Sequence, residues 1–227
     1  MPLLDSIAPR RGLAVAWLAS LALPVAAWLD QTGNPLFYFR YPMPSGQAWF
    51  VAAKLLGLVG LVMLWWQAML GLFPQASARW LGAQRRLNLH RAHGLLVVLT
   101  MLAHAACFVT AASLRSGHVA TQYLWPNWEG YYNTRVSLGL LGLLVLLAAV
   151  AQPLLLWARR RLMVPLLHAF GVLAFYLVAW HGLSIGSETR FPPLQGQILL
   201  MAALLTAALL SRLPGGLAAL RPRPQPA

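Results

Sequence analysis

Six apolar runs, each close to the length that crosses a lipid bilayer, leave this chain few folds to adopt. A transmembrane helix needs about 20 apolar residues to cross a hydrocarbon core roughly 30 Å thick. Of the 227 residues, 59% are hydrophobic and only 9% are charged, so the chain lacks the charged surface of a soluble domain. The sequence predicts an all-α, polytopic membrane helix bundle with six transmembrane helices, at residues 12–29, 48–73, 90–112, 136–157, 164–184 and 195–210.

The arginines between these runs predict the orientation of the helices. If the N-terminus is cytoplasmic and all six runs cross, the cytoplasmic segments carry twelve arginines and the outer segments carry four. Cytoplasmic loops of membrane proteins are enriched in Arg and Lys. The distribution therefore predicts an N-in, C-in bundle, with the inner set being Arg10, Arg11, Arg79, Arg85, Arg86, Arg91, Arg159, Arg160, Arg161, Arg212, Arg221 and Arg223, and the outer set Arg40, Arg115, Arg135 and Arg190.

The runs also divide the chain into three parts. Residues 1–47 hold the first predicted helix and an outer loop, and residues 48–211 hold the other five helices. Residues 212–227 form a Pro- and Arg-rich stretch that we expect to be a disordered cytoplasmic tail. Basic residues precede the first run, so a cleaved signal peptide is the alternative to a retained helix. The apolar stretch continues to Leu29 without a polar mature start, which favours the retained helix.

The net charge of +13 does not indicate a nucleic-acid-binding protein. The basic residues lie in short clusters between apolar runs, and aromatic residues do not alternate with them. The sequence contains no P-loop, GxSxG, HExxH or CxxC motif. Cys107 is the only cysteine, so the chain forms no intrachain disulfide. The first expected partner is therefore the lipid bilayer.

Four of the six histidines fall in two pairs on two apolar runs. His90 and His104 are fourteen residues apart, and His168 and His181 are thirteen apart. At about 1.5 Å per residue, each pair spans roughly 20 Å along its helix. Histidine inside hydrocarbon is costly and marks a candidate functional site. In the predicted orientation His90 and His168 share the cytoplasmic level, while His104 and His181 share the outer level. Each cross-helix pair is suited to hold one six-coordinate heme iron.

The positions of these histidines around the helix axes match less well than their depths. Fourteen residues bring His104 to within about 40° of His90 on an ideal helix, whereas thirteen place His168 and His181 about 140° apart. The helix that carries His168 and His181 therefore needs a kink or bulge, or the two hemes approach it from different sides.

The sequence around the histidines resembles the ferric reductase-like transmembrane domain. The stretch 88–94 (NLHRAHG), followed by 103–104 (AH), is similar to the third transmembrane helix of that family. Residues 167–168 (LH) and 180–182 (WHG) are similar to its fifth. The same spacing is typical of NADPH oxidases and ferric reductases. The resemblance covers roughly residues 48–210 and implies two heme b groups that carry electrons across the membrane.

His93 is a second candidate at the cytoplasmic level. It lies one helical turn from His90, and it either replaces His90 as the inner ligand or contacts a heme propionate. The family spacing favours His90 as the ligand.

Full-length members of this family continue into a cytoplasmic module that binds flavin and NADPH, whereas only a short tail follows Ser211 here. The chain thus resembles the standalone members, such as the heme subunit of the bacterial periplasmic methionine-sulfoxide reductase system. That subunit lacks the complete set of four histidines, so the match to it is not close.

The expected function is that of a transmembrane b-type cytochrome, an electron-transfer oxidoreductase subunit of the bacterial inner membrane. Its expected donor is a cytoplasmic flavin reductase or a quinol, and its acceptor a periplasmic protein or ferric iron. Two alternatives remain open: a quinol-oxidising heme subunit of a periplasmic reductase system, and a non-redox transporter or assembly protein.

Three further features have both a structural and a functional interpretation. The outer segment 113–135 is rich in Trp and Tyr, which indicates an aromatic belt or else a lid over the outer heme. Phe175 and Tyr176 lie between the two histidine levels, where they either pack in the bundle or define the electron path. Lys54, in the second run, either reaches the interface or faces a cavity.

The two histidine pairs predict two hemes per chain, bound without covalent attachment because the sequence contains no CxxCH motif. A pyridine hemochrome assay on the purified protein is expected to give close to two hemes b per polypeptide. A reproducible value near one would refute the assignment of one heme to each pair.

Overall fold

The computed structural model describes the backbone of residues 7–155 and 163–212, and the side chains of residues 12–38, 40–151 and 170–212. Every regular element in these ranges is a helix. In chain order they are α1 (Ile7–Thr32), α2 (Phe37–Arg40), α3 (Gln47–Leu72), α4 (Pro74–Leu81), α5 (Ala83–Ser116), η1 (Thr121–Tyr123), α6 (Gly130–Leu155), α7 (Met163–Ile185), η2 (Glu188–Arg190) and α8 (Pro192–Leu210).

Five of these helices, α1, α3, α5, α6 and α8, are long and apolar enough to cross a membrane. The protein is thus an all-α integral membrane protein. The fifth apolar run falls on α7, whose described apolar part is the shorter stretch Phe170–Ile185. Each of the six predicted runs lies on a different helix. The arginines at 159–161, 221 and 223 and the predicted tail from residue 213 lie outside the described residues.

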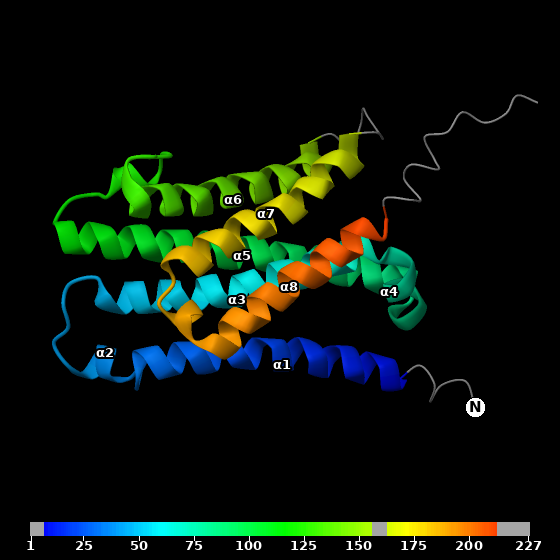
Figure 1. The fold of residues 1–227 in the computed structure, drawn as a ribbon, viewed down its shortest axis with the longest axis horizontal. Helices are drawn as coiled ribbons and strands as arrows, with labels where there is room; N and C mark the ends of the chain where they lie inside the picture. Colours follow the sequence, from blue (N-terminus) through cyan, green and yellow to red (C-terminus); the bar gives the residue numbers. More distant parts are fainter. Residues whose placement is uncertain (1–6, 156–162, 213–227) are drawn as a thin grey trace, which may run out of the picture.

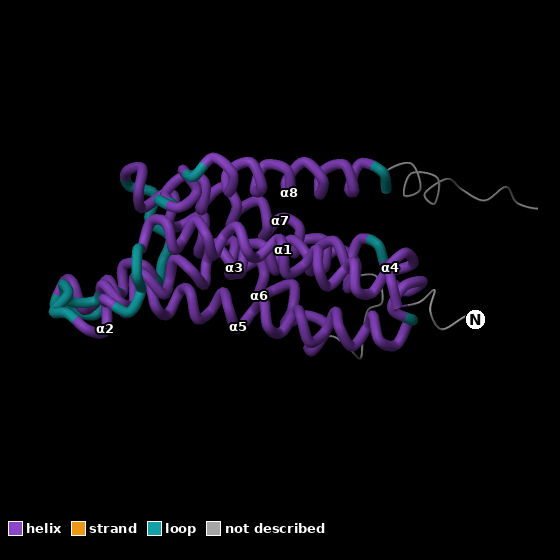
Figure 2. Tube along the Cα trace, turned by 90° about the horizontal axis from the view of Figure 1, so that it is seen from below, coloured by secondary structure: helices purple, strands orange, loops and turns teal. Residues whose placement is uncertain are grey.

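Helix α3 lies at the centre of the bundle. It contacts α1, α5, α7 and α8, and it is the most buried of the five candidate spans. Helices α3 and α5 form one closely packed pair, and α6 and α7 form another (Figure 1). Seen from below, α8 runs along one side of the bundle and α5 along the opposite side (Figure 2).

Both ends of the described chain lie at one end of the bundle, beside α4, which we call the terminal end (Figure 1). The opposite end carries α2 and the connection between α5 and α6, and we call it the loop end.

Glycines allow the close approach of helices within the two pairs. A Cβ atom on Gly60 of α3 would lie 3.0 Å from the sulfur of Met101 on α5, and a Cβ on Gly142 of α6 would lie 2.7 Å from Val178 Cγ2 on α7. Lipid tails are as apolar as the side chains, so helices in a bilayer associate through packing and hydrogen bonds. Small residues at these positions let the paired backbones pack directly.

Tryptophan side chains join the central helix to its neighbours. Trp28 Nε1 on α1 donates to the Val51 carbonyl of α3 (2.9 Å), and Trp65 Nε1 on α3 donates to the Met201 carbonyl of α8 (2.8 Å). Both indoles are buried. The bilayer core contains no water to accept these N–H groups. The two bonds therefore fix α1 and α8 against α3.

Gly142→Ala is expected to lower the stability of the bundle, because the added methyl group would overlap Val178. Overpacking of this kind typically costs about 1–3 kcal/mol. Thermal unfolding of the detergent-purified protein, followed by circular dichroism, measures the loss. Gly171→Ala on α7 is the matched control, since nothing lies within 4 Å of its Cβ position. Equal melting temperatures for the two variants would contradict the close packing of α6 on α7.

Candidate functional site

His104 on α5 and His181 on α7 lie opposite one another toward the loop end. Their ring centroids are 6.3 Å apart, and the ring planes are inclined by 76°. In the described part of the chain α5 and α7 are not themselves a closely packed pair, so the two rings extend toward each other from separate helix pairs. The structure brings together the two residues that the sequence analysis places at the outer level.

The His104 ring rests on the backbone of α3. Its Nδ1–H donates to the Ala53 carbonyl at 2.7 Å. A Cβ atom on Gly57 would lie only 2.9 Å from His104 Cε1 and Nδ1. Gly57 follows Ala53 by four residues, which is about one helical turn. The glycine thus leaves the space that the imidazole fills, and the carbonyl one turn earlier holds it.

His181 rests on α6 in the same way. Its Nδ1–H donates to the Arg135 carbonyl at 2.8 Å, and a Cβ atom on Gly139 would lie 2.8 Å from that nitrogen. Gly139 again follows the accepting residue by four positions. Two separate helix pairs therefore present an imidazole through one and the same arrangement of carbonyl and glycine.

These bonds determine which nitrogen of each ring is available to a ligand. A carbonyl can only accept, so Nδ1 carries the proton in both rings and Nε2 keeps its lone pair. Histidines that bind metals commonly donate their other ring N–H to a backbone carbonyl in this way. A metal–nitrogen bond is about 2 Å long. The 6.3 Å between the ring centroids leaves space for one metal ion between two imidazoles that would bind it from opposite sides.

The number of donors bears on which group could bind. Among the described residues, no three or more His, Cys, Asp and Glu side chains come together as a metal-binding group. A structural zinc site needs four protein ligands. A heme iron takes its equatorial ligands from the porphyrin and needs only axial ligands from the protein. Two imidazoles alone therefore fit an axial heme pair and do not fit a closed zinc site.

Gln67 on α3 contacts the part of α5 that lies toward the terminal end of the bundle. Its amide Nε2 donates to the His90 carbonyl at 2.9 Å and lies 3.2 and 3.3 Å from the ring nitrogens of the same residue. Gly71 lies against the His90 ring, with its Cβ position 3.6 Å from Cε1. Gly57 and Gly71 are fourteen residues apart on α3, as His104 and His90 are on α5. His104 thus lies against Gly57, and His90 lies against Gly71.

His93 uses both of its ring nitrogens within the protein. Its Nδ1–H donates to Gln67 Oε1 at 2.9 Å, and its Nε2 accepts from Trp17 Nε1 on α1 at 3.4 Å. The side chain is only 9% exposed. In this arrangement its lone pair is already engaged, so iron binding by His93 would require the bond to Trp17 to break. The observed contacts make His93 a link between α1, α3 and α5.

His168 lies on α7, but its side chain falls outside the described part of the chain, so the pairing of His90 with His168 stays a prediction. Helix α7 is one uninterrupted α-helix from Met163 to Ile185. Of the two explanations for the thirteen-residue spacing, this continuity favours ligands that leave α7 on different sides.

Lys54 forms an ion pair with Glu188 of η2, at the connection between α7 and α8. The Glu188 carboxylate is buried, and its Oε2 accepts a hydrogen bond from Ser187 Oγ at 2.9 Å. The Lys54 side chain is 19% exposed and is directed at this carboxylate. It follows Ala53 directly, so the neutralised pair lies close to the backbone that holds His104.

Arg135, whose carbonyl binds His181, is itself held between two aromatic rings. Its guanidinium carbon lies 5.0 Å from the Tyr131 ring centroid and 5.3 Å from that of Trp180. Its Nε is buried and has no hydrogen-bond partner in the described protein. An orphaned donor on a cation that lies over Trp180, the residue before His181, suits an anionic group such as a carboxylate.

The remaining candidates differ in burial. Phe175 is fully buried in the core, and the Tyr176 hydroxyl bonds to Thr206 Oγ1 at 2.7 Å, so both pack in the bundle. Trp125 and Trp128 are 75% and 53% exposed, and the aromatic belt and the lid both stay predictions.

No protein-family model, curated protein or solved structure matches this chain. Sequence reasoning missed Gln67 and Glu188 as partners, and it missed the glycines. A polar residue inside the second apolar run and two glycines at the histidine spacing were the signals available.

Gln67→Leu is expected to destabilise the protein by about 1–3 kcal/mol, because it leaves the buried Nδ1–H of His93 without an acceptor. Adding His93→Leu should recover part of the loss, since that polar group is then gone. Thermal unfolding of the single and double variants measures the coupling. Gln84→Leu, at an exposed position of α5, is the matched control. Strictly additive losses would show that Gln67 and His93 do not interact.

Proposed function

We propose that this protein is a membrane b-type cytochrome of the ferric reductase-like class, which relays electrons between the two faces of the membrane. His104 and His181 hold the outer heme in this proposal, and His90 and His168 hold the inner one. The observation that carries it is the loop-end pair, whose 6.3 Å ring separation and Nδ1–H bonds to backbone suit two axial imidazoles.

The proposal includes six crossing helices with both chain ends on the cytoplasmic side. Two observations support this orientation. The ends of the described chain lie at one end of the bundle (Figure 1). The arginines of the sequence concentrate in the segments that this orientation makes cytoplasmic. The loop end is then the outer face.

A bound heme would supply an iron that gains and loses one electron at a time. The chain holds the two imidazoles in one tautomer and one orientation through the carbonyls of Ala53 and Arg135. Gly57 and Gly139 provide the space in which the rings lie. The Arg135 guanidinium lies over the rings of Tyr131 and Trp180, where it would favour a negatively charged group.

The residues around the site also control charge. Glu188 balances Lys54, so no net charge arises on that part of α3. Charges in hydrocarbon are costly unless they are paired. At the inner level the contacts of Gln67 with His90 and His93 hold α5 against α3.

The electron donor follows from the chemistry of the carriers. NAD(P)H donates a hydride, whereas a heme iron accepts single electrons, so a flavin must divide the electron pair. These 227 residues contain no Gly-rich dinucleotide-binding motif. The proposal therefore assigns this step to a cytoplasmic flavin reductase, or replaces it by a quinol. A periplasmic protein or ferric iron takes the electrons at the outer face.

His104→Ala and His181→Ala are each expected to remove the same heme, because either change deprives the iron of one axial ligand. Heme content should fall from two per polypeptide to one, with matching difference spectra (dithionite-reduced minus oxidised). His118→Ala is the control, because His118 is exposed in the loop before η1 and its Nδ1–H donates to the Ser116 carbonyl.

Two results would contradict the proposal. A wild-type protein without any heme spectrum would favour a non-redox membrane protein. Loss of heme from only one of the two variants would show that His104 and His181 do not share an iron.

A further inference from the structure

A cavity opens at the loop end, where α3, α5, η1 and α6 meet. It has a volume of about 320 Å³. Its lining includes Phe50, Phe108, Arg115, Tyr123 and Tyr132. Pockets for small organic molecules start at about 300 Å³. The cavity is therefore large enough for a small ligand, and nothing in the electron-transfer proposal accounts for it.

The walls of this cavity are aromatic. Phe108 and Tyr123 meet edge to face with their ring centroids 5.0 Å apart. Phe50 from α3 and Tyr132 from α6 add two further aromatic rings to the lining. Aromatic rings pack on other rings in stacked or edge-to-face geometry. Such walls favour a planar ring over a flexible chain.

The charge at the cavity is positive. Arg115 is the charged residue among the lining residues, which include no carboxylate. Its guanidinium stacks over Phe50, 4.4 Å from the ring centroid, and one Nη donates to Gln47 Oε1 at 2.5 Å. These two contacts orient the guanidinium, which remains exposed and has further N–H donors. An oriented guanidinium binds a carboxylate strongly, through two parallel hydrogen bonds.

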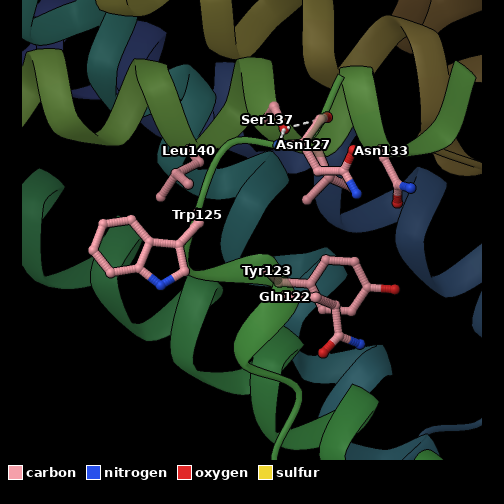
Figure 3. Close-up of a pocket in the computed structure, with 8 residues that line it drawn as sticks. Gln122, Tyr123, Trp125, Asn127, Asn133, Ser137 and Leu140 are labelled. Carbon is pink, nitrogen blue, oxygen red and sulfur yellow. Dashed lines mark hydrogen bonds between the residues drawn. The ribbon is translucent and has the colours of Figure 1, made fainter. Parts of the chain in front are cut away.

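The walls are held in place from both sides. Gly46 at the start of α3 packs so closely on Ala111 of α5 that a Cβ atom could not fit. On the other side Ser137 of α6 bonds both backbone groups of Asn127, its Oγ accepting from N–H (2.7 Å) and donating to the carbonyl (2.8 Å) (Figure 3). Figure 3 shows a separate, smaller hollow beside Asn127 and Ser137, which measures about 10 Å³ and has room for one water only. These contacts hold the helices and the loop that flank the larger cavity, and a site whose surroundings are ordered before binding costs less to fill.

We propose that this cavity is a binding site for a small planar organic anion, an aromatic carboxylate of one or two rings. The ring would lie between Phe50, Phe108 and Tyr123, and the carboxylate would pair with Arg115. Phe108 follows His104 by four residues on α5, so the ligand would lie about one helical turn from the histidine pair. The inference concerns binding alone and does not depend on iron.

The test measures binding of 2-naphthoate to the detergent-purified protein by isothermal titration calorimetry, with protein-free micelles as the blank. Arg115→Gln is expected to weaken binding at least about tenfold, because it removes a charge-assisted bidentate contact. Arg190→Gln is the matched control, an exposed arginine of η2 outside the cavity. Phe108→Leu, which keeps the apolar volume but removes the ring, is also expected to weaken binding.

The neutral analogue 2-naphthamide separates the charge from the ring. It should bind the wild type at least about tenfold more weakly than 2-naphthoate and should not distinguish the wild type from Arg115→Gln. The proposal is overturned if Arg115→Gln and wild type bind 2-naphthoate equally, if the amide binds as tightly as the carboxylate, or if no binding exceeds the micelle blank. Heme spectra recorded on the same samples report on the cytochrome proposal separately.

Discussion

The contact between an imidazole and a glycine on the neighbouring helix is the interaction on which the rest of this structure depends. At Gly57 and Gly139 the missing side chain lets a histidine ring lie on helical backbone. The carbonyl one turn earlier, which is already an acceptor within its own helix, takes the ring N–H as well. A side chain at either glycine would displace the ring from that carbonyl. Within each helix pair these contacts fix the position of one imidazole, and the two rings then face each other between the pairs with their centroids 6.3 Å apart.

Hydrogen bonds between helices then determine how each helix is rotated. The five candidate spans are apolar along most of their length, so burial of an apolar face cannot select one rotation in lipid. Hydrogen bonds of Gln67, Trp28 and Trp65 join α3 to α5, α1 and α8, respectively. An unpaired N–H costs several kcal/mol where no water is present. Rotating α3 by one residue would break several of these bonds at once.

Much of the fold could be predicted from the sequence, because apolar length is a sum over many residues and tolerates local errors. The proximity of His104 to His181 could be predicted because depth follows from loop charges and helical rise. Rotation about the helix axes could not be predicted, since the runs lack a polar face to indicate it. This is why the partners of Lys54 and His93 were missed. The last predicted run began at residue 195, whereas α8 begins at Pro192. Proline is favoured in the first turn of a helix, and the prediction had not used this signal.

The ion pair of Lys54 with Glu188 has a consequence for the order of assembly. Glu188 lies 134 residues after Lys54 in the chain. At the usual synthesis rate of about 5–20 residues per second, the carboxylate leaves the ribosome roughly 7–27 s after the lysine. During that interval the nascent α3 carries an ammonium group whose final counter-ion does not yet exist. The long side chain can meanwhile extend to the headgroup region. This ion pair, which joins α3 to the connection between α7 and α8, can therefore form only after most of the bundle has been synthesised.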